Sequence, residues 1–245
     1  MSRQEISPDE LDGATAVVID VLAATTTLLT ILENGANRVF PAADLEEAEI
    51  VARSLEGTQP IRGGEQGGER IPGYELGPLP DKYPPEVVAG RDVIFVTTNG
   101  TRAIAGAASA DEVLIACLRN APAVARYLEG SGGESVYVIC AGSKGRFNVE
   151  DFLCAAMILS HMDLGNWLLD DASRMALEYA DLHEGNPRRV LEGSRVGRWF
   201  VENQPVETLD FFAEVGASEL VPRVVDGMMY RTDKVQASTR PEPDA

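Results

Sequence analysis

Residues 92–101, DVIFVTTNGT, combine an apolar run with a polar turn, and the rest of the chain can be understood from them. Residues 93–96 form a short apolar run of β-branched and aromatic side chains, which is typical of a fully buried strand. An alanine-rich helix is expected from about Arg102, and a helix N-terminus directly after such a strand favours an anion. Capping of the helix alone would explain the same polar turn. The turn offers four candidate substrate-binding residues: Thr98, Asn99, Gly100 and Thr101.

Two further stretches show the same order of strand, polar loop and helix. Residues 16–22, AVVIDVL, are followed by a threonine cluster, and residues 135–140, SVYVIC, by the loop AGSKG. The stretches from Ala16 and from Asp92 both continue with a second strand and helix, which indicates an internal duplication. Alternating strands and helices predict a three-layer α/β/α fold with a mainly parallel or mixed sheet. Because ligands bind at the edge where such strands end, we expect the three loops to converge.

The rest of the chain is expected to complete the sheet and cover it. Asp44 and Asn120 are the expected caps of two helices. The other expected elements are strands at residues 38–40, 112–116 and about 221–230, and helices at residues 149–162, 166–179, 190–201 and 209–215. We expect residues 1–14 to be a lead-in, residues 15–230 to be one α/β domain or two similar subdomains (about 15–90 and 91–230), and residues 231–245 to be a flexible tail.

A long segment, residues 61–83, IRGGEQGGERIPGYELGPLPDKY, separates the two halves of the duplication. Connections of this length are usually functional or disordered. Because apolar residues lie among its charged ones, we expect an ordered loop folded over the site. Arg70 in this loop and Lys144 after the third strand lie among glycines, where a ligand can approach. They are the best local cations for an anionic substrate, although a solvated loop arginine is the common case.

Composition narrows the class of protein. The 245 residues are 44% hydrophobic, which is enough to bury a substantial core, and the formal net charge is −18. This charge argues against nucleic acid or an anionic membrane as partner, because both need a positive surface. The three cysteines indicate reduced core residues, and the polar N-terminus and lack of long apolar runs predict a cytoplasmic protein. The oligomeric state stays open, with a homodimer as one alternative.

Four acidic residues stand out: Asp20, Glu150, Asp151 and Asp171. Asp20 is expected inside an apolar strand, where a carboxylate needs a cation, a metal or backbone donors; a structural salt bridge is the alternative. Glu150 and Asp151 begin a helix after Asn148, and capping alone would explain both. Asp171 is expected on an apolar helix face, where an ion pair with an arginine would also satisfy it.

Hard oxygen ligands without a histidine cluster indicate magnesium rather than zinc. His161 and His183 have no partner at ligand spacing and are expected to be surface or packing residues. The sequence contains no nucleophile elbow, Walker loop or dinucleotide fingerprint. The candidate chemistry therefore rests on the carboxylates and the three loops.

Five stretches, taken in order, resemble the 2-phosphosulfolactate phosphatase family. They are VIDVLAATTT (18–27), GGERIPGYELG (67–77), TTNGTRA (97–103), CAG (140–142) and NVEDFLCAA (148–156). The similarity runs from about residue 15 to 230. The family belongs to the route to coenzyme M. The resemblance implies a magnesium-dependent phosphatase acting on phosphate esters of 2-hydroxy acids, with an α/β/α fold of its own.

The resemblance marks positions without assigning roles, and our assignment is a hypothesis. Asp20, Glu69 and one of Glu150 or Asp151 hold magnesium, directly or through water. Asp20, Glu69 and Asp151 are the candidate catalytic carboxylates, one of which activates water or serves as nucleophile. The candidate substrate-binding residues are Thr25, Thr26, Arg70, Thr98, Asn99, Gly100, Thr101 and Lys144.

Two departures from the family pattern bear on the substrate. The family usually has arginine where this chain has Ala23, and asparagine and serine where it has Pro78 and Leu79. We therefore weigh two hypotheses. One is a phosphatase, with a substrate that can lack the sulfonate. The alternative is a catalytically silent relative that binds a phosphorylated or carboxylated metabolite, or a partner protein, through the same cleft.

Overall fold

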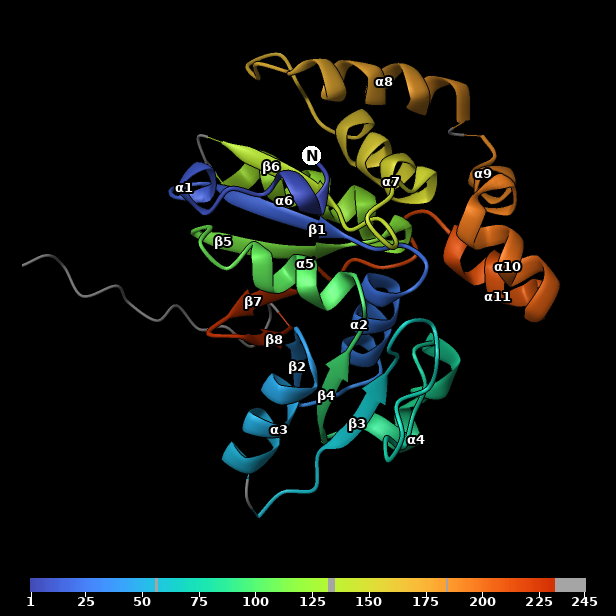
Figure 1. Ribbon diagram of the computed structural model, residues 1–245. Coiled ribbons are helices and arrows are strands. Elements are labelled where there is room, and N and C mark those ends of the chain that lie inside the picture. The colour runs from blue at the N-terminus through green and yellow to red at the C-terminus, as the bar shows by residue number, and fades with distance from the viewer. Residues whose placement is uncertain (56, 132–134, 184, 232–245) are drawn as a thin grey trace, which may run out of the picture.

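The computed structural model describes residues 1–55, 57–131, 135–183 and 185–231, and this part of the chain forms a three-layer α/β/α fold (Figure 1). Its eight strands build one mixed sheet in the order β3-β4-β2-β8-β7-β5-β1-β6. The strands are β1 Thr15–Ile19, β2 Arg38–Ala42, β3 Ile61–Gly64, β4 Asp92–Val96, β5 Glu112–Ala116, β6 Val136–Cys140, β7 Arg223–Val225 and β8 Met228–Tyr230. The predicted fold class is confirmed.

Two groups of parallel strands are joined by an antiparallel hairpin. β1 lies between β5 and β6, and β4 lies between β2 and β3, with parallel pairing in both groups. The hairpin of β7 and β8 pairs with β5 on one side and β2 on the other, antiparallel throughout. Three antiparallel steps thus separate β5 from β2, so the two groups run in opposite senses along the sheet. β3 and β4 also run at a steep angle to β1 and β5 (Figure 1).

The strand order agrees with the predicted duplication. Reading the sheet from either end gives an outer strand, a central strand, its partner and one hairpin strand: β3-β4-β2-β8 against β6-β1-β5-β7. β1 and β4 are the first strands of the two sequence repeats, and each pairs with the second strand of the other repeat. The strands of the two repeats therefore alternate within the sheet.

Helices cover both faces of the sheet. They are α1 Pro8–Leu11, α2 Ala24–Glu33, α3 Leu45–Ser54, α4 Pro85–Val88, α5 Gly100–Gly106, α6 Ala121–Ser131, α7 Val149–Ser160, α8 Asp171–His183, α9 Pro187–Gly193, α10 Arg195–Asn203 and α11 Val206–Ala213. Short 3-10 helices lie at η1 Arg3–Glu5, η2 Pro80–Lys82 and η3 Leu118–Asn120. Alternation along β1 sends Ala16 and Val18 into the core under α2 and α5, and Val17 and Ile19 into the core under α6 and α7.

Several predicted elements have different bounds in the structure. β1 ends at Ile19, so Asp20 is the first residue of the loop rather than part of the strand. The single strand expected at residues 221–230 is a hairpin, because Asp226 and Gly227 both adopt positive φ and form the tight turn that an Asp-Gly pair favours. Residues 61–64, expected in a loop, form β3 and pair with β4.

The helices of the C-terminal third also differ from the prediction. The helix expected at residues 190–201 is two helices, α9 and α10, because Ser194 leaves the helical path and its hydroxyl caps α10 by accepting from Gly197 N at 2.8 Å. α8 begins at Asp171 rather than at residue 166. Leu168, inside the predicted helix, lies before α8 and is fully exposed, and Met175 within α8 is also exposed.

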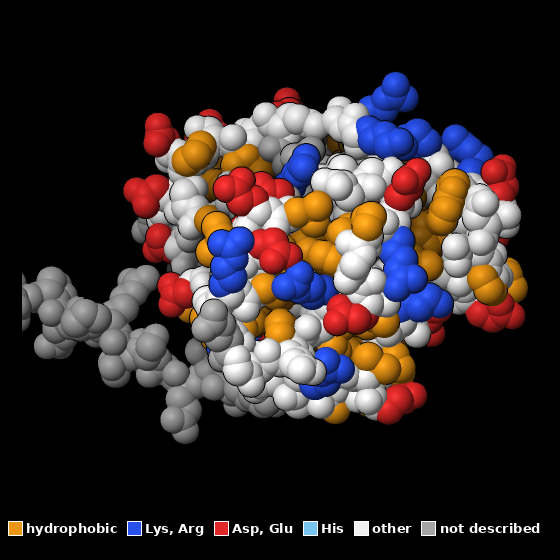
Figure 2. All heavy atoms as spheres, turned by 60° about the horizontal axis from the view of Figure 1, so that its bottom comes forward, with side chains coloured by type: hydrophobic (Ala, Val, Ile, Leu, Met, Phe, Trp, Pro, Cys, Tyr) orange, Lys and Arg blue, Asp and Glu red, His pale blue; other side chains and the backbone are white. Residues whose placement is uncertain are grey.

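The surface of the molecule is mixed in charge. On the face turned toward the viewer in Figure 2, lysine and arginine side chains lie among acidic and hydrophobic ones. The net negative charge therefore does not give this face a continuous acidic patch. Among the described residues, no helix is both long enough and apolar enough to cross a membrane.

Candidate active site

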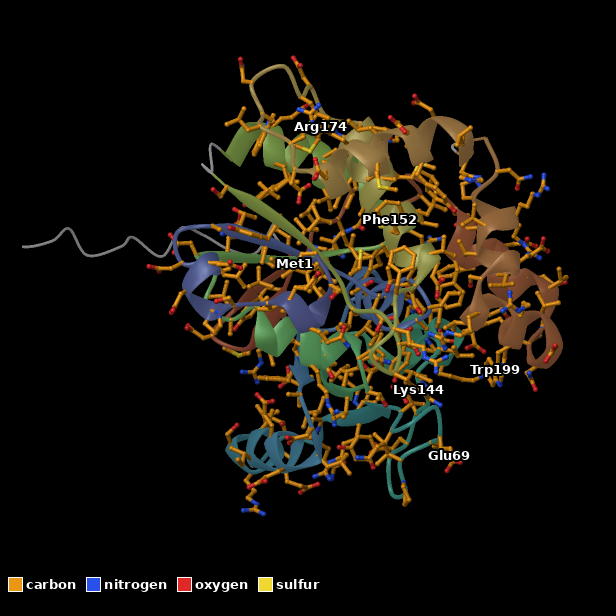
Figure 3. The ribbon with its side chains drawn as sticks, turned by 45° about the horizontal axis from the view of Figure 1, so that its top comes forward. Met1, Glu69, Lys144, Phe152, Arg174 and Trp199 are labelled. Atoms are coloured by element: carbon orange, nitrogen blue, oxygen red, sulfur yellow. The ribbon has the colours of Figure 1, made fainter. Side chains whose placement is uncertain are left out.

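The loops after four strands surround one cavity of about 590 Å³. They follow β1, β3, β4 and β6, and α10 closes a further side. Five of the polar residues that line the cavity are Asp20, Glu65, Glu69, Thr98 and Lys144. The labelled side chains of Glu69, Lys144 and Trp199 lie on the same side of the molecule (Figure 3). The loops that the sequence predicted to converge therefore do so.

The loop after β1 is held in shape by its own threonines. Thr25 N and Thr25 Oγ1 both donate to Asp20 O, at 3.0 and 2.9 Å, and Thr25 Oγ1 accepts from Asp20 N at 2.9 Å. Thr26 Oγ1 donates to Val21 O at 2.9 Å. Both threonines are fully buried and neither lines the cavity. Their hydroxyls, predicted to bind substrate, instead shape the loop that presents Asp20.

The turn after β4 is built in the same way. Thr101 Oγ1 accepts from Thr97 N at 3.0 Å and donates to Thr97 O at 2.9 Å, while Thr97 Oγ1 accepts from Thr101 N at 3.1 Å. Thr101 is fully buried, whereas Thr98 and Asn99 line the cavity. Thr101 thus holds the turn, whereas Thr98 and Asn99 form part of the cavity wall.

Gly100 allows the two central loops to meet. A Cβ at this position would lie 2.8 Å from Asp20 Oδ2 and closer still to the Cβ of Ala24. Only a residue without a side chain lets α5 begin against the carboxylate of Asp20. The carboxyl ends of β1 and β4 therefore come together although their strand groups run in opposite senses.

Glu65 also lines the cavity, although it was not among the predicted site residues. Its Oε1 accepts from Thr98 N at 2.6 Å, and its Oε2 accepts from Thr98 Oγ1 at 2.9 Å and from Gly68 N at 2.6 Å. The sequence Gly-Gly-Glu occurs twice in this segment, ending at Glu65 and at Glu69. The repeat was a usable signal, but only the pairing of β3 with β4 shows that Glu65 faces the Thr98 turn.

Asp151 joins the loops after β1 and β6. It is fully buried, and its Oδ1 accepts from Val21 N at 2.9 Å while its Oδ2 accepts from Gly142 N at 3.0 Å. The capping role considered from the sequence is wrong, because the carboxylate bonds to loop amides of other segments rather than to the start of α7. Burial, and then the charges of Asp20 and Glu150, raise the pKa of Asp151 well above its ordinary value.

Asp20 and Glu150 complete a buried acidic cluster with Asp151. Asp20 is 5% exposed. Burial first, then the charge of Glu150 and less strongly that of Glu65, raise the pKa of Asp20 to about 7, although backbone N–H groups of Ala24 and Gly100 lower it. Burial, more than repulsion between the acids, therefore disfavours the ionised form of Asp20.

Glu150 is the least satisfied member of this cluster. It is fully buried, and neither of its carboxylate oxygens has a hydrogen-bond partner among the described residues. Burial raises the pKa of Glu150, and nearby Ser194 and Arg195 offset only part of this effect. A buried carboxylate in this state requires a proton or a cation close by.

Glu69 and Arg70 lie differently from each other. Glu69 is exposed and lines the cavity. Arg70 turns away, because its Nη2 donates to Tyr74 O at 2.9 Å and to Glu75 O at 2.8 Å, and it lines a separate hollow made by residues 70–75. Arg70, predicted to bind substrate, instead holds its own loop.

Two cations line the cavity among the described residues. Lys144 adopts a left-handed φ of 53°, and its backbone N–H donates to Asn99 Oδ1 at 3.4 Å. Arg195, at the start of α10, was not foreseen from the sequence. Its Nη2 donates to Asn148 Oδ1 at 2.9 Å and to Ser143 O at 3.3 Å. Arg195 therefore connects α10 to the loop after β6.

Two other residues that stood out in the sequence, Asp171 and Asn120, lie outside the cavity. Asp171 is exposed at the start of α8 rather than on a buried face. Asn120 is fully buried, but it does not cap α6. Its side chain accepts from Cys117 N at 2.9 Å and donates to Ile115 O and Leu220 O. It therefore fastens the segment after β5 to the chain that leads into the hairpin.

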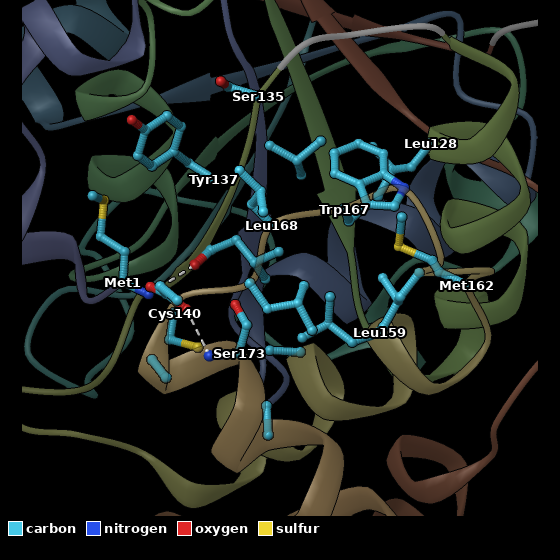
Figure 4. Close-up of a pocket in the computed structure, with 18 of the residues that line it drawn as sticks. Met1, Leu128, Ser135, Tyr137, Cys140, Leu159, Met162, Trp167, Leu168 and Ser173 are labelled. Atoms are coloured by element: carbon cyan, nitrogen blue, oxygen red, sulfur yellow. Dashed lines mark hydrogen bonds between the residues drawn. The ribbon is translucent and has the colours of Figure 1, made fainter.

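A second cavity, of about 550 Å³, lies between β6, α7 and the segment before α8 (Figure 4). The N-terminus borders it: the Met1 ammonium group donates to Val138 O at 3.1 Å, and Cys140 N donates to Met1 O at 3.0 Å. Leu159 and Trp167 contribute apolar surface. Of the described residues that line it, none is a site residue predicted from the sequence.

The predicted metal ligands do not form a ready-made metal site. Within the part of the chain that the structure describes, no three or more histidine, cysteine, aspartate or glutamate side chains are grouped so that they could hold a metal ion. Asp20, Glu65 and Glu69 nevertheless line one cavity. Any ion bound there would need ligands from a substrate or from water as well.

Comparisons with known proteins agree on one family. A family model described as 2-phosphosulpholactate phosphatase matches residues 1–227. The chain is 40% identical over 223 residues to a probable 2-phosphosulfolactate phosphatase of Symbiobacterium thermophilum, an overlap that covers 90% of this chain and 95% of the relative. Probable 2-phosphosulfolactate phosphatases of Deinococcus radiodurans and Caldanaerobacter subterraneus are 36% and 34% identical, over 92% and 91% of this chain and 93% of each relative.

Proposed function

The chain belongs to the 2-phosphosulfolactate phosphatase family, and from this premise we propose that it is a phosphoric monoester hydrolase that cleaves the phosphate ester of a small 2-hydroxy acid such as 2-phosphosulfolactate. The observation that carries the proposal is the shared cavity, in which the carboxylate of Asp20 lies against the start of α5 and beside the Thr98 turn. The carboxylate of Asp20 would therefore lie next to any anion bound at this turn.

An anionic substrate needs local positive charge in a protein with a net charge of −18. The cavity supplies the side chains of Lys144 and Arg195. Thr98 and Asn99 add polar groups, and the N-terminal end of α2 adds the positive end of a helix dipole. In our proposal these groups orient the phosphate and the carboxylate of the substrate.

We further propose that a divalent cation, Mg²⁺ in the sequence-based prediction, acts with these residues. The unpartnered oxygens of Glu150 and the raised pKa of Asp20 fit this proposal, because a nearby cation would stabilise the ionised form of both buried carboxylates. Mg²⁺ often uses one or two carboxylates together with water and substrate phosphate. Asp20 and a glutamate of the β3 loop, Glu65 or Glu69, would hold it. When bound, it would offset phosphate charge during attack at phosphorus.

The protein's own residues then have separate tasks. Asp20 is the carboxylate that activates water or attacks phosphorus, because it lies in the cavity and its pKa of about 7 is near neutral pH. Asp151 holds the backbone behind it at Val21 and Gly142. In hydrolysis the bond between phosphorus and the ester oxygen breaks, a bond to water oxygen forms, and the alcohol oxygen leaves with a proton.

Phosphate release from 2-phosphosulfolactate, with and without Mg²⁺, tests the proposal. We expect release by the wild-type protein and a loss of at least about a hundredfold in Asp20→Asn, the usual scale for removing a catalytic acid or base. Asp171→Asn is the matched control, because this carboxylate is exposed at the start of α8. Full activity of Asp20→Asn would remove Asp20 from the site. Inactivity of the wild-type protein would favour the silent relative. A homodimer and a cytoplasmic location stay predictions.

A further inference from the structure

One side of the active-site cavity is apolar. The loop after β1, the segment before η2 and the helix α10 all contribute hydrophobic side chains to its lining: Leu22, Ala23, Leu79, Val196, Trp199 and Phe200. The acidic and hydroxyl groups come instead from the ends of the strands. The cavity therefore offers a ligand both a polar, charged surface and a sizeable apolar one.

Trp199 is the most prominent part of this apolar wall. It is 49% exposed although it is among the largest hydrophobic side chains of the protein. Its ring packs edge-on against Phe200 with centroids 5.3 Å apart, and Phe200 packs in the same way against the buried Phe212 at 5.4 Å. The tryptophan is thus supported from the core while one side stays open to the cavity. A rigid aromatic surface of this kind is suited to contact the apolar part of a ligand.

The charged residues that line the cavity also favour a substrate with an apolar substituent. A 2-hydroxy acid ester with a sulfonate carries three anionic groups, whereas Lys144 and Arg195 are the two cations that line the cavity among the described residues. Arg195 already donates to Ser143 O and Asn148 Oδ1. The divalent ion proposed above would be used by the phosphate, so a sulfonate would need a further cation, whereas an apolar substituent needs none. It would also bury the otherwise hydrated face of Trp199.

We propose that this cavity accepts phosphate monoesters of 2-hydroxy acids whose third carbon carries an apolar or aromatic group, and that Trp199 is the residue that contacts this group. The inference rests on the proposed phosphatase function and narrows its substrate class. The products are inorganic phosphate and the free 2-hydroxy acid, with water supplying the oxygen that replaces the ester oxygen on phosphorus.

Three esters test this inference: 2-phosphosulfolactate, 2-phospholactate and 2-phospho-3-phenyllactate. We expect the wild-type protein to hydrolyse the phenyl ester with a kcat/KM at least equal to that for 2-phosphosulfolactate. Trp199→Ala should lower kcat/KM for the phenyl ester about tenfold, mainly through KM, and change the other two less than about threefold, because only one aromatic contact is lost. Trp199→Phe should restore most of the loss.

The outcomes separate this inference from the proposed function. Trp167→Phe is the matched control, because Trp167 lines the second cavity, and it leaves Trp199 as the only tryptophan whose fluorescence reports binding of 3-phenyllactate. Hydrolysis of 2-phosphosulfolactate without hydrolysis of the phenyl ester would overturn the inference alone. An equal effect of Trp199→Ala on all three esters would do the same. Failure to hydrolyse any ester would overturn the proposed function and the inference with it.

Discussion

The carboxylate of Glu65 holds the loop after β4 as the carboxylate of Asp151 holds the loop after β1. Glu65 Oε1 accepts from Thr98 N at 2.6 Å, and Asp151 Oδ1 accepts from Val21 N at 2.9 Å. In each case the second oxygen accepts from a glycine N–H beyond the neighbouring outer strand. β4 and β1 are the central strands of the two parallel groups, so in each group an acid that follows the outer strand in sequence holds the loop after the central strand.

Glu65→Gln is expected to lower both stability and activity. The new amide nitrogen cannot accept a hydrogen bond, so either Thr98 or Gly68 loses its acceptor. We expect the free energy of unfolding to fall by about 1–3 kcal/mol, measured by chemical denaturation. Glu69→Gln is the comparison, because Glu69 is exposed. Equal destabilisation by both substitutions would show that Glu65 does not stabilise the turn after β4. A larger loss of activity in Glu69→Gln would support Glu69 as a catalytic carboxylate, as the sequence predicted.

Gly100→Ala is expected to disturb the active site through sterics alone. The added methyl group would push against Asp20 Oδ2 and Ala24. We expect a loss of about 1–3 kcal/mol in unfolding free energy, the usual range for overpacking, together with a strong fall in kcat. Gly106→Ala, at the other end of α5, is the control, because its Cβ would meet only the end of the Ile6 side chain, at 3.4 Å. Unchanged kcat in Gly100→Ala would show that the position of the Asp20 carboxylate does not limit catalysis.

Local sequence patterns predict the central parts of this fold. The apolar runs of β1, β4 and β6 and the polar loops behind them are visible in the chain, because a buried strand and a helix start each leave a short signature. Asp20 could also be selected, since a carboxylate among apolar residues needs a partner. For Asp151, the position at a helix start indicated only a capping role. The backbone N–H groups of Gly100, near Asp20, and of Val21, bonded to Asp151, lie far away in sequence and leave no such local signature.

Other features depend on packing between distant segments. Glu65 and Glu69 follow identical Gly-Gly pairs, and only the pairing of β3 with β4 distinguishes them. Arg195 and Trp199 lie about a hundred residues from the Thr98 turn in sequence, and they reach the cavity because the chain breaks its helix at Ser194. Arg70 looked like a ligand because of its glycine-rich surroundings, yet nearby carbonyl groups satisfy its guanidinium group.

Asp20→Asn is expected to change how stability depends on pH. The pKa of Asp20 in the folded protein is about 7, above the ordinary value of 3.8, so the folded state binds more protons between these pH values than the unfolded state does. Stability from this group is complete below about pH 4 and is lost as pH rises toward 7. Asn cannot ionise, so without divalent ions we expect the variant to be more stable at pH 7.5, by about 1–3 kcal/mol.

Denaturation curves from pH 4 to 8, for wild type, Asp20→Asn and Asp171→Asn, measure this difference. Part of the pH dependence should persist in Asp20→Asn, because burial also raises the pKa values of Glu150 and Asp151. Asp171→Asn should follow the wild type, since its carboxylate is exposed. Parallel curves for wild type and Asp20→Asn would show that Asp20 ionises in the folded protein as it does in the unfolded chain.

Glu150→Gln is expected to reduce the stabilisation that a divalent cation gives to the fold. Both oxygens of Glu150 are buried without a hydrogen-bond partner, and its charge adds to that felt by Asp20. Removing this charge should stabilise the protein at pH 8 without added metal, because burial raises the pKa of Glu150. It should also weaken the attraction for Mg²⁺, so that added Mg²⁺ raises the Tm less in the variant than in the wild type.

Thermal unfolding with Mg²⁺ and with EDTA measures both effects without an activity assay. Equal Mg²⁺-dependent increases in Tm for the two proteins would exclude Glu150 from the charge that attracts the ion. No increase in either protein would show that the ion does not bind the free protein, and repeating the measurement with inorganic phosphate would test whether it binds together with phosphate.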